Sequence, residues 1–125
     1  MNDCSLKIDY ILKENSVVVL YFYDNIYYEY IPQIKNLISE FKELGINKII
    51  INLSECFFIE KDIWKYLVEI KSDFSKSNGD IIISDISGAV KNDYNLMELS
   101  NSLQAFQDIN AALYYFGIIA SSKYA

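Results

Sequence analysis

Two runs of three isoleucines, separated by a segment with helical periodicity, constrain the fold of this chain more than any other feature. Residues 49–51 and 81–83 are both Ile-Ile-Ile, and such uninterrupted β-branched runs are typical of strands that are covered on both faces. Between them, Ile63, Leu67 and Ile70 recur at steps of four and three residues, which places them on one face of a helix. This order predicts two parallel neighbouring strands joined by a right-handed helical crossover.

The residues before this unit predict a hairpin and a helix. Residues 6–12 largely alternate between apolar and polar types, as a half-exposed strand does, and residues 16–23 form a second strand rich in β-branched and aromatic side chains. Residues 24–25 are expected to end that strand. An apolar stripe then predicts a helix that begins at about residue 30 and runs to about residue 44, where Gly45 suits the position after a helix end.

The remaining segments complete an alternating pattern of strands and helices. Residues 54–59 are expected to connect the first isoleucine strand to a helix that starts near Glu60, and this junction is the first place to look for function. After the second isoleucine run, Val90 and Tyr94 lie near one face of a further helix. A short edge strand at residues 105–106 and a last helix at residues 111–116 follow. The pattern predicts an α/β fold, and 125 residues fit a single domain, residues 1–125.

Charge and composition exclude several classes of function. The net charge is -6, and all 11 positively charged side chains are lysines, which disfavours binding to nucleic acid or to an anionic membrane surface. The chain has no histidine, so the usual general base and the common imidazole metal ligand are missing. We therefore expect no enzymatic activity, no catalytic residue, no metal and no cofactor.

Two features bear on the cellular compartment. No apolar run approaches the about 20 residues that a transmembrane helix needs, and the first residues lack the pattern of a signal peptide. Cys4 and Cys56 lie far apart and form no CxxC pair, so we expect two reduced thiols rather than a disulfide or a metal site. The sequence predicts a cytoplasmic protein.

Three stretches, in this order along the chain, resemble the STAS domain, which bacterial anti-sigma factor antagonists share with the cytoplasmic tails of sulfate transporters. They are IIINLSECFFIEKDIWKYL at residues 49–67, ISDISGAVKNDYNLMELSNSL at residues 83–103 and AFQDINAALYYFG at residues 105–117. The resemblance covers about residues 6–117. It implies a mixed sheet of four or five strands with about four helices packed over it.

The antagonist branch of the family also implies a function. An antagonist of this kind is a non-enzymatic protein-interaction module that binds an anti-sigma factor kinase, and this partner switching regulates transcription in bacteria. Phosphorylation of a serine at the start of the second long helix turns the interaction off, because a phosphate brings about 1.5 to 2 negative charges into an interface fitted to a hydroxyl.

This chain departs from the family pattern at that helix start. The alignment of the motifs puts Glu60 at the family's aspartate, Lys61 and Asp62 at its two serines, and Ile63 at its glycine. Asp62 thus occupies the position of the phosphorylated serine, so phosphorylation at the usual position is not expected. Tyr27 stands where many antagonists have an acidic residue.

We expect a partner-binding surface at this helix start, formed by Glu60, Lys61, Asp62, Ile63 and Trp64, with Tyr27 and Ser87 at its border. Alternatives stay open for the role of Asp62 and for the function of the domain. Asp62 either stabilises the helix start and does nothing else or holds the domain in a state that resembles the phosphorylated one. The domain could instead bind a small ligand, as a sensor, in a pocket near Tyr27 and Trp64. The other alternative function is that of a small carboxylate-dependent enzyme, which the missing histidine disfavours.

Overall fold

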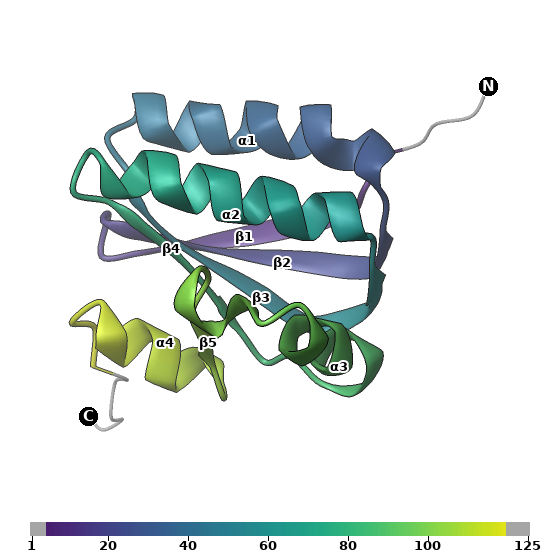
Figure 1. Ribbon diagram of the computed structural model, residues 1–125. Helices are drawn as coiled ribbons and strands as arrows, with labels where there is room; N and C mark the ends of the chain where they lie inside the picture. The colour runs from purple at the N-terminus through teal and green to yellow at the C-terminus, as the bar shows by residue number, and fades with distance from the viewer. Residues whose placement is uncertain (1–4, 120–125) are drawn as a thin grey trace.

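The computed structural model describes residues 5–119, which form a five-stranded mixed sheet with helices on both faces. The strand order is β1-β2-β3-β4-β5; β1 runs antiparallel to β2, and the other neighbours are parallel. Helices α1 and α2 lie side by side over one face, and α4 lies against the other (Figure 1). The strands are β1 (Ile8–Lys13), β2 (Val17–Ile26), β3 (Lys48–Ile59), β4 (Asp80–Ser84) and β5 (Ala105–Phe106). The helices are the 3-10 turns η1 (Tyr28–Tyr30) and η2 (Leu99–Asn101) and the α-helices α1 (Ile31–Glu43), α2 (Lys61–Ser75), α3 (Gly88–Leu96) and α4 (Ile109–Tyr115).

The two isoleucine runs form the centre of the sheet, as the sequence predicts. Strands β3 and β4 are parallel neighbours, with residues 49–51 paired in register with residues 81–83. All six isoleucines have no exposed surface. Ile50 and Ile82 pack on the α4 side, and the other four pack beneath α1 and α2. Each run is therefore covered on both faces, which accounts for its lack of alternation.

The predicted hairpin and helices are also present. Strand β1 pairs with β2 without a register shift, helix α1 starts at Ile31, and Gly45 follows it with a φ of 85°. Strand β5 occupies residues 105–106 as expected. Val90 and Tyr94 are the buried residues of α3, as expected. The helix ends at Leu96, and Glu98, with a left-handed φ of 55°, separates it from η2.

Two expected strand ends are wrong, and both errors concern the same ladder. Strand β2 continues through residues 24–25 to Ile26, and β3 continues through residues 54–59 instead of becoming a loop. The two strands stay paired because the ladder absorbs two register irregularities, one of them at Asp24, which has a φ of 65°. Such irregularities let a ladder continue while it bends and re-aims side chains. No helix within residues 5–119 is long and apolar enough to cross a membrane.

Candidate functional site

Glu60 ties the start of α2 to the end of β2. It occupies the N-cap position of α2, and its backbone N–H donates a hydrogen bond of 2.9 Å to the carbonyl oxygen of Ile26. Its side chain does not cap its own helix. Instead, Glu60 Oε1 accepts a hydrogen bond of 2.7 Å from the backbone N–H of Tyr28. The structure thus brings Glu60 and the segment of Tyr27 together, although they lie more than thirty positions apart, which agrees with the predicted surface.

Lys61 and Asp62 form the exposed first turn of α2. Within the described residues, neither side chain has a hydrogen bond or an ion pair. A carboxylate in a first helical turn interacts favourably with the backbone dipoles there, so Asp62 suits its position without any partner. Both side chains are therefore available to contact another protein.

Ile63 and Trp64 do not belong to the surface, so their predicted place in a partner-binding face is wrong. Both have no exposed area. They share a buried side of α2 with Leu67, because β3 extends to Ile59 and already places the first turn of the helix over the sheet. The Trp64 ring lies 5.9 Å from the ring of Tyr94 in α3. These residues support the helix start from below.

Exposed aromatic side chains surround the helix start. Tyr27, which is 36% exposed, lies with its ring 6.0 Å from those of both Tyr30 and Phe58. Phe57 and Phe58 were not among the predicted site residues, yet they are 65% and 41% exposed. In the structure, only Cys56 and Ile59 are buried in β3 past residue 53, which leaves the two phenylalanines outside. The available sequence signal was the aromatic pair that follows the polar residues Ser54 and Glu55.

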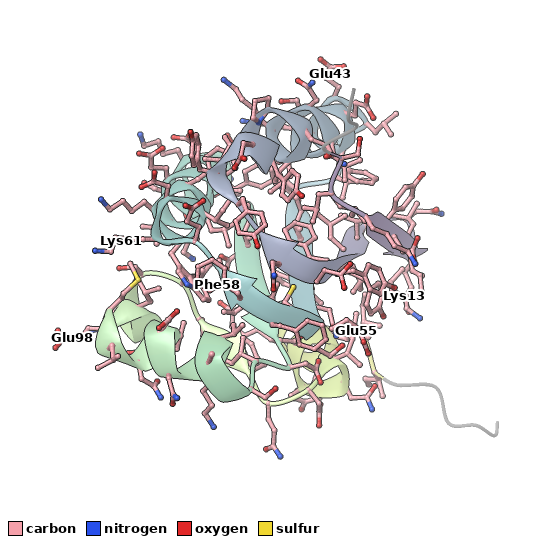
Figure 2. The ribbon with its side chains drawn as sticks, turned by 90° about the vertical axis from the view of Figure 1, so that its right-hand side faces the viewer. Lys13, Glu43, Glu55, Phe58, Lys61 and Glu98 are labelled. Atoms are coloured by element: carbon pink, nitrogen blue, oxygen red, sulfur yellow. The ribbon has the colours of Figure 1, made fainter. Side chains whose placement is uncertain are left out.

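A cavity of about 350 Å³ opens between the start of α2 and helix α3. Phe58 and Lys61, which lie next to each other in Figure 2, form one wall. Leu96, 80% exposed, belongs to the opposite wall. Tyr27 does not line this cavity. The full lining is Phe58, Ile59, Lys61, Trp64, Asp93, Leu96 and Met97.

Ser87 lies at the N-cap of α3, is exposed, and makes no side-chain cap hydrogen bond. No hydrogen bond or ring contact among the described residues joins it to the start of α2. Its place at the border of the partner-binding surface stays a prediction.

Cys56 lies beneath this region, and its thiol is unreactive. Its Sγ donates a hydrogen bond of 3.2 Å to the carbonyl oxygen of Phe22. Burial, together with the nearby charges of Asp24 and Glu55, raises the pKa of the Cys56 thiol to about 12. The neutral thiol is a poor nucleophile and a poor metal ligand. Cys4 lies outside the described residues, and no group of three potential metal ligands occurs within residues 5–119.

The family model that matches the chain is the STAS domain, over residues 11–112. The chain belongs to the STAS domain family. That match spans the strands and helices that build the site, from β1 to α4. No curated protein sequence matches this STAS domain significantly.

Solved structures share the fold over most of its length. The unphosphorylated form of the anti-sigma factor antagonist SpoIIAA has a TM-score of 0.75 at 16% identity, covering 90% of this chain and 99% of that one. An anti-sigma factor antagonist from Mycobacterium paratuberculosis has a TM-score of 0.73 at 14% identity, with coverages of 90% and 95%. SLC26A9 has a TM-score of 0.58 at 16% identity, covering 80% of this chain and 19% of that larger one. These likenesses establish the predicted STAS fold, with five strands and four α-helices.

Proposed function

We propose that this STAS domain is a non-enzymatic protein-interaction module of the anti-sigma factor antagonist type, acting in partner switching in the bacterial cytoplasm. Its partner is a protein, with an anti-sigma factor kinase as the first candidate. The proposed contact area, called here the α2-start surface, lies where the family resemblance puts the antagonist interface. It consists of Tyr27, Tyr28, Phe57, Phe58, Lys61, Asp62 and Leu96.

The observation that carries this proposal is the exposed apolar area around the helix start. Phe57, Phe58 and Leu96 are 65%, 41% and 80% exposed, and Tyr28 is 55% exposed. Large exposed apolar patches on a small domain mark interaction sites. Aromatic side chains are enriched in protein interfaces because they give a large contact area at a small loss of side-chain entropy.

The proposed module has lost the usual switch. Asp62 carries a carboxylate where the family's serine accepts a phosphoryl group, so a serine kinase cannot modify that position. Its single charge only partly imitates a phosphate, which carries about 1.5 to 2. The side chain is exposed and without a partner in the described part of the chain, so its charge faces any bound protein. We propose that this charge holds the domain permanently in a phosphorylated-like state, in which binding to the kinase is weakened but not abolished.

The first experiment measures binding to each purified anti-sigma factor kinase of the same genome by isothermal titration calorimetry. Phe58→Ala is expected to weaken binding by a factor of about 30 or more, as loss of an interface hot spot does. Leu44→Ala is the matched control, because Leu44 is 74% exposed and follows α1, outside the α2-start surface. Equal losses in both variants would place the contact elsewhere, and no binding to any of the kinases by either the wild type or the Asp62→Ser variant would remove the antagonist reading.

The second experiment asks whether the missing hydroxyl alone abolished the switch. Asp62→Ser restores a serine in the first turn of α2, and intact-mass spectrometry after incubation with the bound kinase and Mg-ATP should detect one added phosphoryl group. The wild type should keep its mass. An unchanged mass in the Asp62→Ser variant would count against the idea that this position was once the switch.

A sensory, ligand-binding function is the second candidate, and the cavity between α2 and α3 favours it. The indole Nε1 of Trp64 is buried and has no hydrogen-bond partner among the described residues, and Trp64 is among the lining residues. Thermal shift against nucleotides and small metabolites distinguishes the two readings, because a ligand that binds the folded state raises the melting temperature. No stabilisation at millimolar ligand would dismiss this candidate.

A further inference from the structure

We propose that β1 is a self-pairing edge, so that two copies of this chain join their sheets through antiparallel β1 strands related by a two-fold axis at Ile11. This inference does not depend on the function of the α2-start surface. It concerns the opposite side of β2, and it names a second copy of this chain as the partner.

The outer edge of β1 has neither a proline nor a bulge, and its two charged residues, Asp9 and Lys13, are of opposite sign. Tyr10, Ile11 and Leu12 are 56%, 46% and 42% exposed, three consecutive apolar residues on a six-residue strand. Its ladder to β2 has no bulge, and no described strand pairs with its other side. Proteins normally guard such edges with proline, bulges or outward lysines, because a regular, apolar edge invites another strand.

The lysine that precedes the strand does not guard it. The Lys7 ammonium lies 4.6 Å from the centre of the Tyr23 ring, folded over the sheet of its own chain. At the other edge of the sheet, β5 has only two residues, Ala105 and Phe106, both half-buried. The β5 edge is therefore too short to pair with another strand, whereas the β1 edge has six residues, is regular and is unpaired among the described residues.

The sequence of β1 is complementary to itself in one register. With the axis at Ile11, antiparallel pairing sets Asp9 opposite Lys13 of the second copy at both ends of the pair, and Tyr10 opposite Leu12. Opposite charges set directly across strands stabilise a pair, as do apolar neighbours. With the axis at Tyr10, Lys7 would face Lys13 and Asp9 would face Ile11. The charges therefore select the Ile11 register.

The two faces of the joined sheet are also matched. Asp9, Ile11 and Lys13 stand across from Tyr21, Val19 and Val17, on the side that α4 covers. Tyr10 and Leu12 stand across from Leu20 and Val18, on the side of α1. Thus Ile11 meets its own copy on the face where both ion pairs form, and Tyr10 meets Leu12 on the other face.

The wild-type chain provides the primary test. In sedimentation equilibrium, the mass should rise from 14.5 kDa towards twice that value as the concentration increases from about 1 to 300 µM, because self-association follows mass action. A mass that stays at 14.5 kDa throughout, or one that passes beyond a dimer, would overturn the proposal.

Charge exchange tests the register. Asp9→Lys or Lys13→Asp alone should each weaken the dimer by about ten-fold or more, since each sets like charges opposite at two places. Asp9→Lys also removes the hydrogen bond that Tyr23 donates to Asp9, so the double variant decides. Asp9→Lys with Lys13→Asp should restore the wild-type dissociation constant to within about three-fold. Lys65→Asp on exposed α2 is the control. A double variant as weak as the single ones would refute the ion pairs.

Cysteine cross-linking tests the axis itself. In a Cys4→Ser background, Ile11→Cys should form an intermolecular disulfide when oxidised in air with copper-phenanthroline, because a residue on the axis faces its own copy. Tyr10→Cys should not. Efficient cross-linking of Tyr10→Cys instead of Ile11→Cys would show a different register and overturn the proposal.

Discussion

The two halves of β3 belong to one strand but serve different purposes. Residues 48–52 pair with β2 on one side and β4 on the other, and the three isoleucines among them are fully buried. Residues 54–59 pair with β2 alone, and only Cys56 and Ile59 of that half are buried. The first half holds the sheet together, and the second extends past the end of β4 to carry exposed aromatic side chains to the start of α2.

This difference between the two halves indicates where residues can be substituted without unfolding the protein. In the inner half, every substitution meets packed atoms from two neighbouring strands and from helices on both faces. In the outer half, Phe57 and Phe58 are 65% and 41% exposed, so their identity can follow the partner. The helix start beside them has a buried underside, Ile63 and Trp64, and an exposed top, Lys61 and Asp62.

The largest expected effect comes from Trp64, where the exposed top of α2 meets its buried underside. Trp64→Ala should lower the free energy of unfolding by about 3–5 kcal/mol, because it empties a fully buried site among packed residues. Urea denaturation measures this. Lys65→Ala, the next residue and an exposed one, should change it by less than about 0.5 kcal/mol. Equal small effects in both would mean that Trp64 belongs to the surface after all.

The next effect compares the two halves of β3 directly. Ile50→Ala should cost about 2–5 kcal/mol of unfolding free energy, because Ile50 is fully buried beneath α4. Phe57→Ala removes a larger side chain, but Phe57 is 65% exposed, so less than about 0.5 kcal/mol is expected. Denaturation curves of the two variants under the same conditions give the comparison. A Phe57→Ala loss as large as that of Ile50→Ala would erase the distinction between the halves.

Cys56, in the outer half of β3, should make the free energy of unfolding depend on pH. Its pKa is raised from 9.0 to about 12, mainly by burial, so the folded state holds the thiol proton more tightly than the unfolded state does. The resulting stability is complete below pH 9 and is lost as pH rises towards 12. Urea midpoints between pH 8 and about 10.5 should therefore fall less steeply in Cys56→Ala than in the wild type. Tyr66, whose pKa is also raised to about 12 by burial, contributes to the fall that both proteins share, as do Tyr23, Tyr94 and Tyr115, whose pKa values are raised as well. Identical slopes would show that the thiol does not titrate with unfolding.

The inner half of β3 could be predicted from sequence because burial on both faces leaves a direct mark, a run of isoleucines. The helix starts at residues 31 and 61 were also predictable from apolar spacing. The outer half was missed because Ser54 and Glu55 look like loop residues. Both are exposed in the strand, where the pairing of β3 with β4 has already ended at Asn52. The continuation of the β2–β3 ladder through an irregularity at Asp24 could not be predicted from any sequence pattern.

The errors at the site have a similar cause. Trp64 lies three positions before Leu67, so helical spacing alone places both on one side. It was assigned to the surface only because it adjoins the other residues of the helix start. Tyr10 and Leu12 fall on the apolar side of β1, yet they are 56% and 42% exposed. Alternation identifies which side of a strand faces a core, but it cannot say how far the covering helix reaches.

The smallest expected effect concerns Asp62 and separates its simplest role from any role in binding. Asp62→Asn keeps the shape of the side chain and removes its charge, so it should lower the unfolding free energy by about 0.3–1 kcal/mol through the lost interaction with the helix N-terminus. Glu69→Gln, in the middle of α2 and also exposed, should have no such effect, because the influence of the helix dipole falls off within the first turn. At about 1 M salt, where the screening length falls to about 3 Å, the difference between the variants should shrink. If both variants behave alike at low salt, the dipole account of Asp62 fails, and any effect of Asp62→Asn on partner binding must come from direct contact.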